Sequence, residues 1–200
     1  HRTNPIGSKS LNSSSRLMIL EIVNYPAPVL RKVGARVEDV TPKIEKLAED
    51  MIETMYEAKG VGLAAPQIGK SLQMAVIDVS FDEECISYLR VNGEDAELED
   101  ICPLVFINPE IKPLGEKETD IEGCLSFPDL RSEITRPGEV KAEMTLLDGS
   151  TITIETDGLF SRAIQHEVDH LFGKLFIDRM TSVRKLAIKR QLKELQAEYG

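Results

Sequence analysis

The strongest constraint on this chain comes from one short motif, H-E-x-x-H, which is formed by His166, Glu167 and His170. Residues four apart lie on one face of an α-helix about one turn apart, so both imidazoles can reach a single metal ion. The glutamate between them then projects toward the open position of that ion, where a general base for a bound water has to lie. The motif therefore predicts a metal-binding helix.

The flanking residues predict where this helix begins and ends. Asp157 is a favourable N-cap, and Gly173 is a natural stop after the motif. An H-E-x-x-H pattern also arises by chance on ordinary amphipathic helices. Composition argues against chance here, because His1 at the end of the chain is the only histidine besides His166 and His170.

A catalytic site of this kind needs a third protein ligand, with water in the fourth position. One known arrangement places a third histidine six residues after the second, but Phe176 occupies that position here. The third ligand therefore has to be Cys, Asp or Glu. Cys124 is the candidate, because a thiolate binds divalent transition metals well, whereas Cys85 and Cys102 lie in or beside an acidic stretch. The alternative interpretation makes Cys124 a small buried hydrophobe.

Length and charge limit the class of protein. A chain of 200 residues suits one domain with a sizeable core, and a net charge of −10 argues against direct DNA binding and against nucleic acid as a primary ligand. Three cysteines without a C-x-x-C pair fit a reduced, cytoplasmic protein. We see no membrane-spanning run and expect no membrane partner.

The first seventeen residues differ from the rest of the chain. They are polar, contain no acidic residue and show no periodicity, and Met18 follows them. We predict that residues 1–17 are a leader or tag, either disordered or derived from expression, and that residues 18–200 form the catalytic domain. Since Arg- and Ser-rich, acid-poor segments also characterise transit peptides, an organelle transit remnant is the alternative.

The periodicity of the chain predicts an α+β fold with a single domain. We expect antiparallel or mixed β-sheets packed around the central metal-binding helix, with a long N-terminal helix and a C-terminal helix. The long helix begins at Thr41-Pro42 and runs to Gly60. The predicted strands are 19–23, 72–79, 105–111 (broken at Pro109), 140–147 and 151–155, with a hairpin turn at Asp148-Gly149. Residues 81–102 hold eight acidic residues against a single Arg90, which predicts a solvated surface insertion.

A run of small residues from Gly60 to Gly69 follows the long helix. It lacks the G-x-G-x-x-G and Lys-Ser/Thr patterns of nucleotide-binding loops, so we reject nucleotide binding. Small residues allow another backbone, or a substrate, to approach closely. Gln67 is the only side chain between Gly60 and Gly69 that can offer a hydrogen bond. The alternative is a plain helix-to-strand connection.

Taken together, these motifs resemble those of the peptide deformylases, metallohydrolases that remove the N-formyl group from nascent polypeptides. Three family motifs occur in order: GVGLAAPQ at residues 60–67, EGCLS at 122–126 and QHEVDH at 165–170. The resemblance covers Met18 to the C-terminal helix. The leader and the acidic stretch depart from the family pattern, and the latter leaves substrate preference open.

The resemblance implies a mechanism that agrees with the metal site deduced above. Cys124, His166 and His170 would bind the metal, leaving a fourth position for a water of lowered pKa. Glu167 would take the proton of that water as it attacks the formyl carbon and deliver it to the leaving amine. The metal, the Gln67 side-chain amide and the Leu125 backbone N–H would stabilise the oxyanion.

The resemblance also implies a substrate site. The formylmethionyl peptide would add as a strand beside Gly62, and the Glu122–Arg136 pair would brace the cysteine loop. Because Leu159 and Ala163 share the helical face of the two histidines, they suit the wall of a methionine pocket. The full set of expected substrate-binding residues is Val61, Gly62, Gly123, Leu159, Ala163 and Arg131, with Leu125 as a further wall.

The family implies ferrous iron in cells, and the Cys/His/His set also suits Zn²⁺, Ni²⁺ or Co²⁺. Besides N-formylmethionyl nascent chains, we expect a ribosome contact through the basic face of the C-terminal helix. Two other functions remain open. A metallopeptidase with a carboxylate third ligand would cleave unformylated peptides, and a closed structural metal site would need Cys85 or Cys102 as fourth ligand.

Overall fold

A computed structural model of the protein describes residues 16–200, with the side chains of residues 83 and 84 excepted. One seven-stranded sheet forms its frame, in the order β1-β2-β5-β6-β7-β3-β4 with every neighbouring pair antiparallel. The α+β architecture agrees with the expected fold class. The strands form one sheet, and all its pairs are antiparallel, so it is not a mixed sheet. The strands are β1 (Gly62–Ala64), β2 (Met74–Ile77), β3 (Leu89–Val91), β4 (Glu94–Asp95), β5 (Leu104–Gly123), β6 (Arg131–Thr145) and β7 (Thr151–Asp157).

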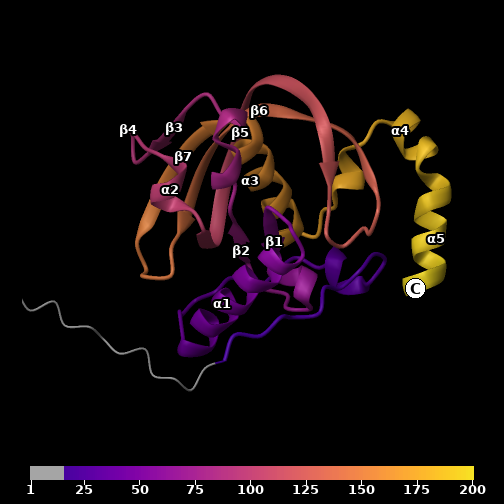
Figure 1. Ribbon diagram of the computed structural model, residues 1–200, viewed down its shortest axis with the longest axis horizontal. Coiled ribbons are helices and arrows are strands. Elements are labelled where there is room, and N and C mark those ends of the chain that lie inside the picture. The colour runs from indigo at the N-terminus through magenta and orange to yellow at the C-terminus, as the bar shows by residue number, and fades with distance from the viewer. Residues whose placement is uncertain (1–15) are drawn as a thin grey trace, which may run out of the picture.

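The helices pack around this sheet in three hydrophobic clusters (Figure 1). The first cluster joins the sheet to the central helix, the second joins the loop after β5 to the C-terminal segment, and the third joins the first helix to β1 and β2. None of the described helices is long and apolar enough to cross a membrane. The α-helices are α1 (Pro42–Glu57), α2 (Leu98–Ile101), α3 (Gly158–Leu171), α4 (Ser182–Ala187) and α5 (Lys189–Tyr199); 3-10 helices are η1 (Pro28–Arg31), η2 (Ala65–Ile68), η3 (Ser80–Cys85) and η4 (Phe176–Arg179).

Helix α3 carries the H-E-x-x-H motif and is buried along almost its whole length, from Phe160 to Leu171. It begins directly after β7, as the sequence predicts, but the Asp157 side chain makes no capping hydrogen bond. That carboxylate instead accepts hydrogen bonds from the backbone N–H groups of Ser87 and Tyr88. The reason is the tight β7–α3 junction, where Gly158 has a φ of +57° and lies against the Cys85 carbonyl.

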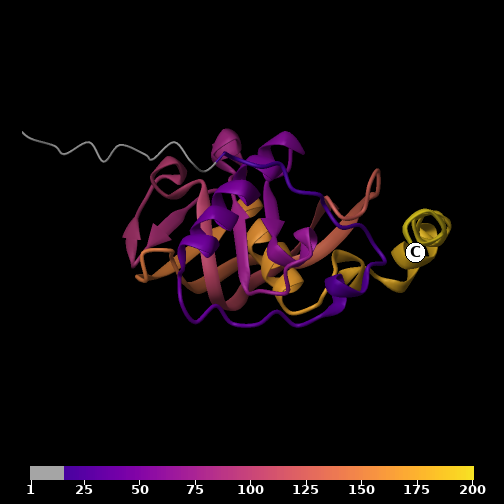
Figure 2. The same ribbon diagram turned by 90° about the horizontal axis from the view of Figure 1, so that it is seen from below.

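A long hairpin of β5 and β6 delivers the predicted cysteine to this helix. The predicted strands 105–111 and 140–147 are only its inner half, because β5 continues to Gly123 and β6 starts at Arg131. Pro109 does not end the strand, since a register shift between Ile107 and Glu110 absorbs it. Figures 1 and 2 show the hairpin extending from the sheet toward the C-terminal helices.

One other sequence prediction is wrong, and another holds only in part. Residues 19–23 form no strand, because their backbone N–H groups bond to other partners than a neighbouring strand: Leu20 to Thr54 Oγ1 and Val23 to the Gln67 carbonyl. The acidic stretch 81–102 is also more than a surface insertion. Its β3 pairs with β7, and Leu89 and Leu98 are buried in the core.

The predicted leader falls mostly on residues 1–15, which lie outside the described residues. The predicted C-terminal helix is present as two helices, α4 and α5. Figure 2 shows α5 end-on at the edge of the molecule. Its contact with the rest of the protein runs through Ile188 and Leu195, which belong to the same cluster as Phe127 and Phe176.

The Thr54 hydroxyl provides a test of how the N-terminal segment is held on α1. This buried hydroxyl accepts from the Leu20 N–H at 2.8 Å. We expect Thr54→Val to lower the free energy of unfolding by about 1–3 kcal/mol, because the N–H loses its partner. Urea unfolding followed by circular dichroism measures this. Thr151→Val, at an exposed strand position, should change stability by less than about 0.5 kcal/mol, and an equal loss in both variants would contradict the assignment.

Candidate metal centre and active site

Three side chains that the sequence singles out as metal ligands lie together in the structure. Cys124 follows β5, and His166 and His170 project from successive turns of α3. The Cys124 Sγ lies 3.3 Å from His170 Nε2, which lies 3.2 Å from His166 Nε2, and the three ligand atoms are all within 4.8 Å of one another. Two nitrogens each about 2.0–2.1 Å from a tetrahedral ion are separated by roughly 3.3 Å. The cluster therefore has the spacing of a tetrahedral site.

A buried carboxylate orients the first histidine. His166 Nδ1 donates to Glu122 Oε1 at 2.9 Å, which leaves Nε2 directed at the cluster. Glu122 also accepts two hydrogen bonds from the Arg136 guanidinium, at 2.7 and 3.0 Å. Burial alone would raise the pKa of Glu122, but hydrogen bonds from His166 and Arg136 hold it well below its ordinary value. The predicted Glu122–Arg136 support is thus a direct contact.

Arg136 continues the network to a residue that the sequence analysis missed. Its Nη1 donates to Asp169 Oδ2 at 3.0 Å, and Asp169 accepts two further bonds from Arg179. Asp169 precedes His170 in the chain, so these ion pairs fix the helical turn that carries the second histidine. The sequence offered one sign of this role, because Asp169 is an acidic residue between the two histidines. His170 Nδ1 itself has no hydrogen-bond partner among the described residues.

The Glu167 carboxylate has the surroundings of a general base. It is 3 % exposed, and its Oε1 is buried without a hydrogen-bond partner among the described residues. Burial raises the pKa of Glu167 to about 7. Its Oε2 lies in the space that a side chain at Gly62 would fill, 2.4 Å from the position of an added Cβ. A side chain at position 62 would therefore collide with the Glu167 carboxylate, as well as with any peptide backbone that approached β1.

Gln67 lies on η2 with its amide directed at the cysteine. Its Oε1 accepts from the Ala64 N–H, and its Nε2 donates to Ser126 Oγ at 3.1 Å and lies 3.5 Å from Cys124 Sγ. This arrangement fixes which end of the amide carries the donors. The donor end of the amide is thereby held beside the Cys124 sulfur.

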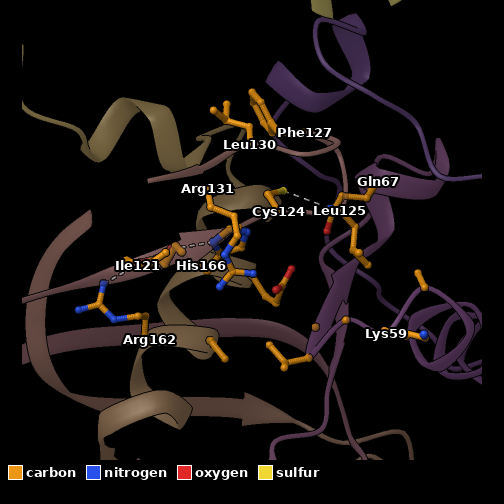
Figure 3. Close-up of a pocket in the computed structure, with 18 of the residues that line it drawn as sticks. Lys59, Gln67, Ile121, Cys124, Leu125, Phe127, Leu130, Arg131, Arg162 and His166 are labelled. Carbon is orange, nitrogen blue, oxygen red and sulfur yellow. Dashed lines mark hydrogen bonds and ion pairs between the residues drawn. The ribbon is translucent and has the colours of Figure 1, made fainter. Parts of the chain in front are cut away.

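These groups open into a cavity of about 590 Å³ (Figure 3). Its walls contain every predicted substrate-binding residue: Val61, Gly62, Gly123, Leu125, Arg131, Leu159 and Ala163. Gln67, Glu122, Cys124, His166 and Glu167 also line it, whereas His170 and Arg136 lie behind the wall. The cavity is also lined by Ile121, Phe127, Leu130 and Arg162, which no sequence motif marks. Ile121 is 56 % exposed on the outer hairpin, where no periodicity marks it.

The model of the polypeptide deformylase family matches residues 19–186 of this chain. The chain belongs to the polypeptide deformylase family. Enzymes of this family are hydrolases, and the chain is one of them.

Relatives named peptide deformylase resemble the chain over most of its length. The protein of Methylacidiphilum infernorum is 45 % identical over 90 % of this chain and 94 % of its own, and that of Opitutus terrae is 42 % identical over 89 % and 93 %. Solved deformylase structures agree with the fold. That of Plasmodium falciparum has a TM-score of 0.77 at 34 % identity, covering 90 % of this chain and 96 % of its own. That of Thermus thermophilus has a TM-score of 0.75 at 36 % identity, covering 91 % and 100 %.

The other two cysteines of this deformylase lie away from the cluster. Cys85 is exposed at the end of η3, and Cys102 follows α2 beside Asp78. Among the side chains of residues 16–200 that the structure describes, those of 83 and 84 being left out, the only group of three metal-binding side chains with suitable spacing is Cys124, His166 and His170. A closed structural site completed by Cys85 or Cys102 therefore has no geometric support.

Burial of Cys102 leads to a prediction about thiol reactivity. Burial raises the pKa of the Cys102 thiol to about 11, so the reactive thiolate is about 0.1 % of the population at pH 8 and grows about tenfold per pH unit. We expect iodoacetamide to modify Cys102 slowly at pH 8 and much faster at pH 10, as followed by peptide mass spectrometry. The same reaction in urea is the control, and equal rates at pH 8 in folded and unfolded protein would contradict this.

Proposed function

We propose that this protein removes the N-formyl group from formylmethionine at the N-terminus of nascent polypeptides and releases formate. The observation that carries the proposal is the Glu167 carboxylate, buried with an unpartnered oxygen beside a three-ligand metal cluster that faces a 590 Å³ cavity. Three protein ligands and a neighbouring base fit hydrolysis better than a closed structural site.

The ligand set fits a divalent transition metal. One thiolate and two imidazoles bind Fe²⁺, Zn²⁺, Ni²⁺ or Co²⁺, and we propose Fe²⁺ as the ion in cells. Such an ion supplies Lewis acidity, which makes hydroxide available near neutral pH. Glu122 holds His166 ready for it through the hydrogen bond described above, and the ion pairs of Asp169 with Arg136 and Arg179 hold the helical turn that carries His170.

The protein residues then divide the proton transfers and the charge stabilisation. Glu167 accepts a proton from the attacking water as the C–O bond to the formyl carbon forms. It returns that proton to the amine nitrogen as the C–N bond breaks, so that formate and a free amino terminus result. The Gln67 Nε2 and the Leu125 N–H donate to the oxyanion between these steps, and each such donor is typically worth about 10²–10³ in turnover.

The sheet supplies a place for the peptide backbone. β1 is an edge strand, paired with β2 only, so an extended peptide can add beside Gly62 by backbone hydrogen bonds. The cavity wall of Val61, Leu125, Leu159 and Ala163 is apolar and suits a methionine side chain. Gly123 and Arg131, paired across the end of the hairpin, lie on the remaining side.

The decisive experiment compares wild type with Glu167→Ala on formyl-Met-Ala-Ser, using anaerobically purified protein loaded with nickel or iron. We expect wild type to release formate and the variant to lose about 10²–10⁴ in turnover while still binding one metal ion, because the base is absent but the ligands remain. Formate release and metal content are the measurements. Glu194→Ala, a change at an exposed position of α5, is the matched control.

A metal-loaded wild-type protein that releases no formate would contradict the proposal. The runner-up function, a metallopeptidase of the same motif, predicts cleavage of unformylated peptides, and a panel of such peptides separates the two. Cys124→Ser separates them further, since a carboxylate-ligated peptidase would keep its metal.

We also propose that α4 and α5 bind ribosomal RNA in the cytoplasm, where nascent chains emerge. Lys185, Lys189, Arg190 and Lys193 are all exposed there, in a chain of net charge −10. Changing all four to Glu should abolish co-sedimentation with ribosomes at low salt without reducing deformylation of a short peptide. Co-sedimentation that survives the change would count against this contact.

A further inference from the structure

Arg162 lies one helical turn before His166 on α3 and is buried, with a side chain 10 % exposed. Its guanidinium reaches three acceptors. Nη1 donates to Glu122 Oε2 at 2.7 Å and to the Ile134 carbonyl at 2.9 Å, and Nη2 donates to the Glu118 carbonyl at 3.1 Å. Figure 3 shows Arg162 and His166 projecting from α3 toward the hairpin. A buried arginine is costly unless it is paired in this way.

The contact with Glu122 completes the hydrogen bonding of the carboxylate that orients His166. Glu122 Oε1 accepts from His166 and Arg136, and Oε2 accepts from Arg136 and Arg162. Arg136 approaches from β6 and Arg162 from α3, so the carboxylate is held from two elements. Without Arg162, the Glu122 carboxylate would keep its contacts with Arg136. His166 would then be its only remaining partner on α3.

The two carbonyl contacts tie the same helix to both strands of the hairpin. Glu118 belongs to β5 and Ile134 to β6, where Ile134 pairs with Asp120. Glu118 and Glu122 both lie in the last part of β5, just before Cys124. Arg162 therefore sets how far the end of β5, and with it the cysteine ligand, lies from the helix that carries the histidine ligands.

The fork geometry of the side chain matters for this role. A guanidinium presents several N–H donors in one plane and can serve a carboxylate and two carbonyls at once, whereas a lysine ammonium is a point donor. Arg162 also lies between two cavities, because it lines both the active-site cavity and a neighbouring one of about 410 Å³.

We infer that Arg162 is a positioning residue for the metal centre: it holds Glu122, and through it the His166 ring, and it fixes the distance of Cys124 from α3. This inference rests on the proposed metal site. Arg162 itself makes no contact with the reacting atoms, so its effect has to appear in ligand geometry and metal retention.

The test compares Arg162→Met and Arg162→Lys with wild type, each loaded with Co²⁺. Arg36→Met, at an exposed position that lines neither cavity, is the matched control. Three quantities are measured: the visible ligand-field and thiolate bands of bound Co²⁺, the rate of metal transfer to a chelator, and kcat and KM on formyl-Met-Ala-Ser.

For Arg162→Met we expect shifted Co²⁺ bands, metal release faster by roughly 10–100-fold, and a similar loss in kcat with KM within about threefold of wild type. Arg162→Lys should lie closer to Arg162→Met than to wild type, because the single ammonium nitrogen cannot reach all the acceptors that Arg162 serves from two nitrogens. Arg36→Met should match wild type in all three measurements.

Unchanged bands and an unchanged release rate in Arg162→Met would overturn the inference, even with a lower melting temperature, because the residue would then only stabilise the fold. If Arg162→Met fails to fold, Arg162→Lys decides by the same criteria. If bound Co²⁺ shows no thiolate band in wild type, the metal site itself is overturned. That outcome differs from one in which wild type binds Co²⁺ through its thiolate and the Arg162 variants behave like wild type.

Discussion

The buried Glu122 carboxylate is the contact on which the rest of the site depends. It meets His166, Arg136 and Arg162, which come from one helix and one strand, and each of its oxygens accepts two hydrogen bonds. A buried charge of this kind is favourable only when its partners are complete, and removing one partner typically costs about 3–5 kcal/mol. The same network therefore sets both the positions of the proposed metal ligands and the packing of the β5–β6 hairpin against α3.

Much of the site was predictable because its chemistry depends on spacing within short segments. The turn of an α-helix fixes the relation of His166 to His170, and the scarcity of other ligands left few candidates besides Cys124. Arg162 was not predictable in this way. Its partners are backbone carbonyls and a carboxylate some 28 to 44 residues away in sequence, and only the fold brings them together. A charged residue one turn before a predicted ligand was the sole local sign.

The fold was predictable where one face of an element is buried and unpredictable where both faces are polar. α1 begins at its Thr41 cap as expected, and β7 and the inner part of β6 alternate apolar and polar residues. In the outer hairpin, β5 is exposed from Glu116 to Ile121 and carries no such alternation. Conversely, the largely apolar residues 19–23 suggested a strand, but side chains of α1 accept from the N–H groups of Met18 and Leu20 in place of a sheet edge.

The contact between Gly62 and Glu167 limits how this enzyme can change. The missing side chain at Gly62 leaves room for the carboxylate, and the same residue lies on the edge strand open to a peptide. In the proposed mechanism, peptide recognition and proton transfer therefore share this space, and any side chain at position 62 would displace the Glu167 carboxylate. Under that proposal, variation in substrate preference has to occur at other positions that line the cavity, such as Val61 or Ile121.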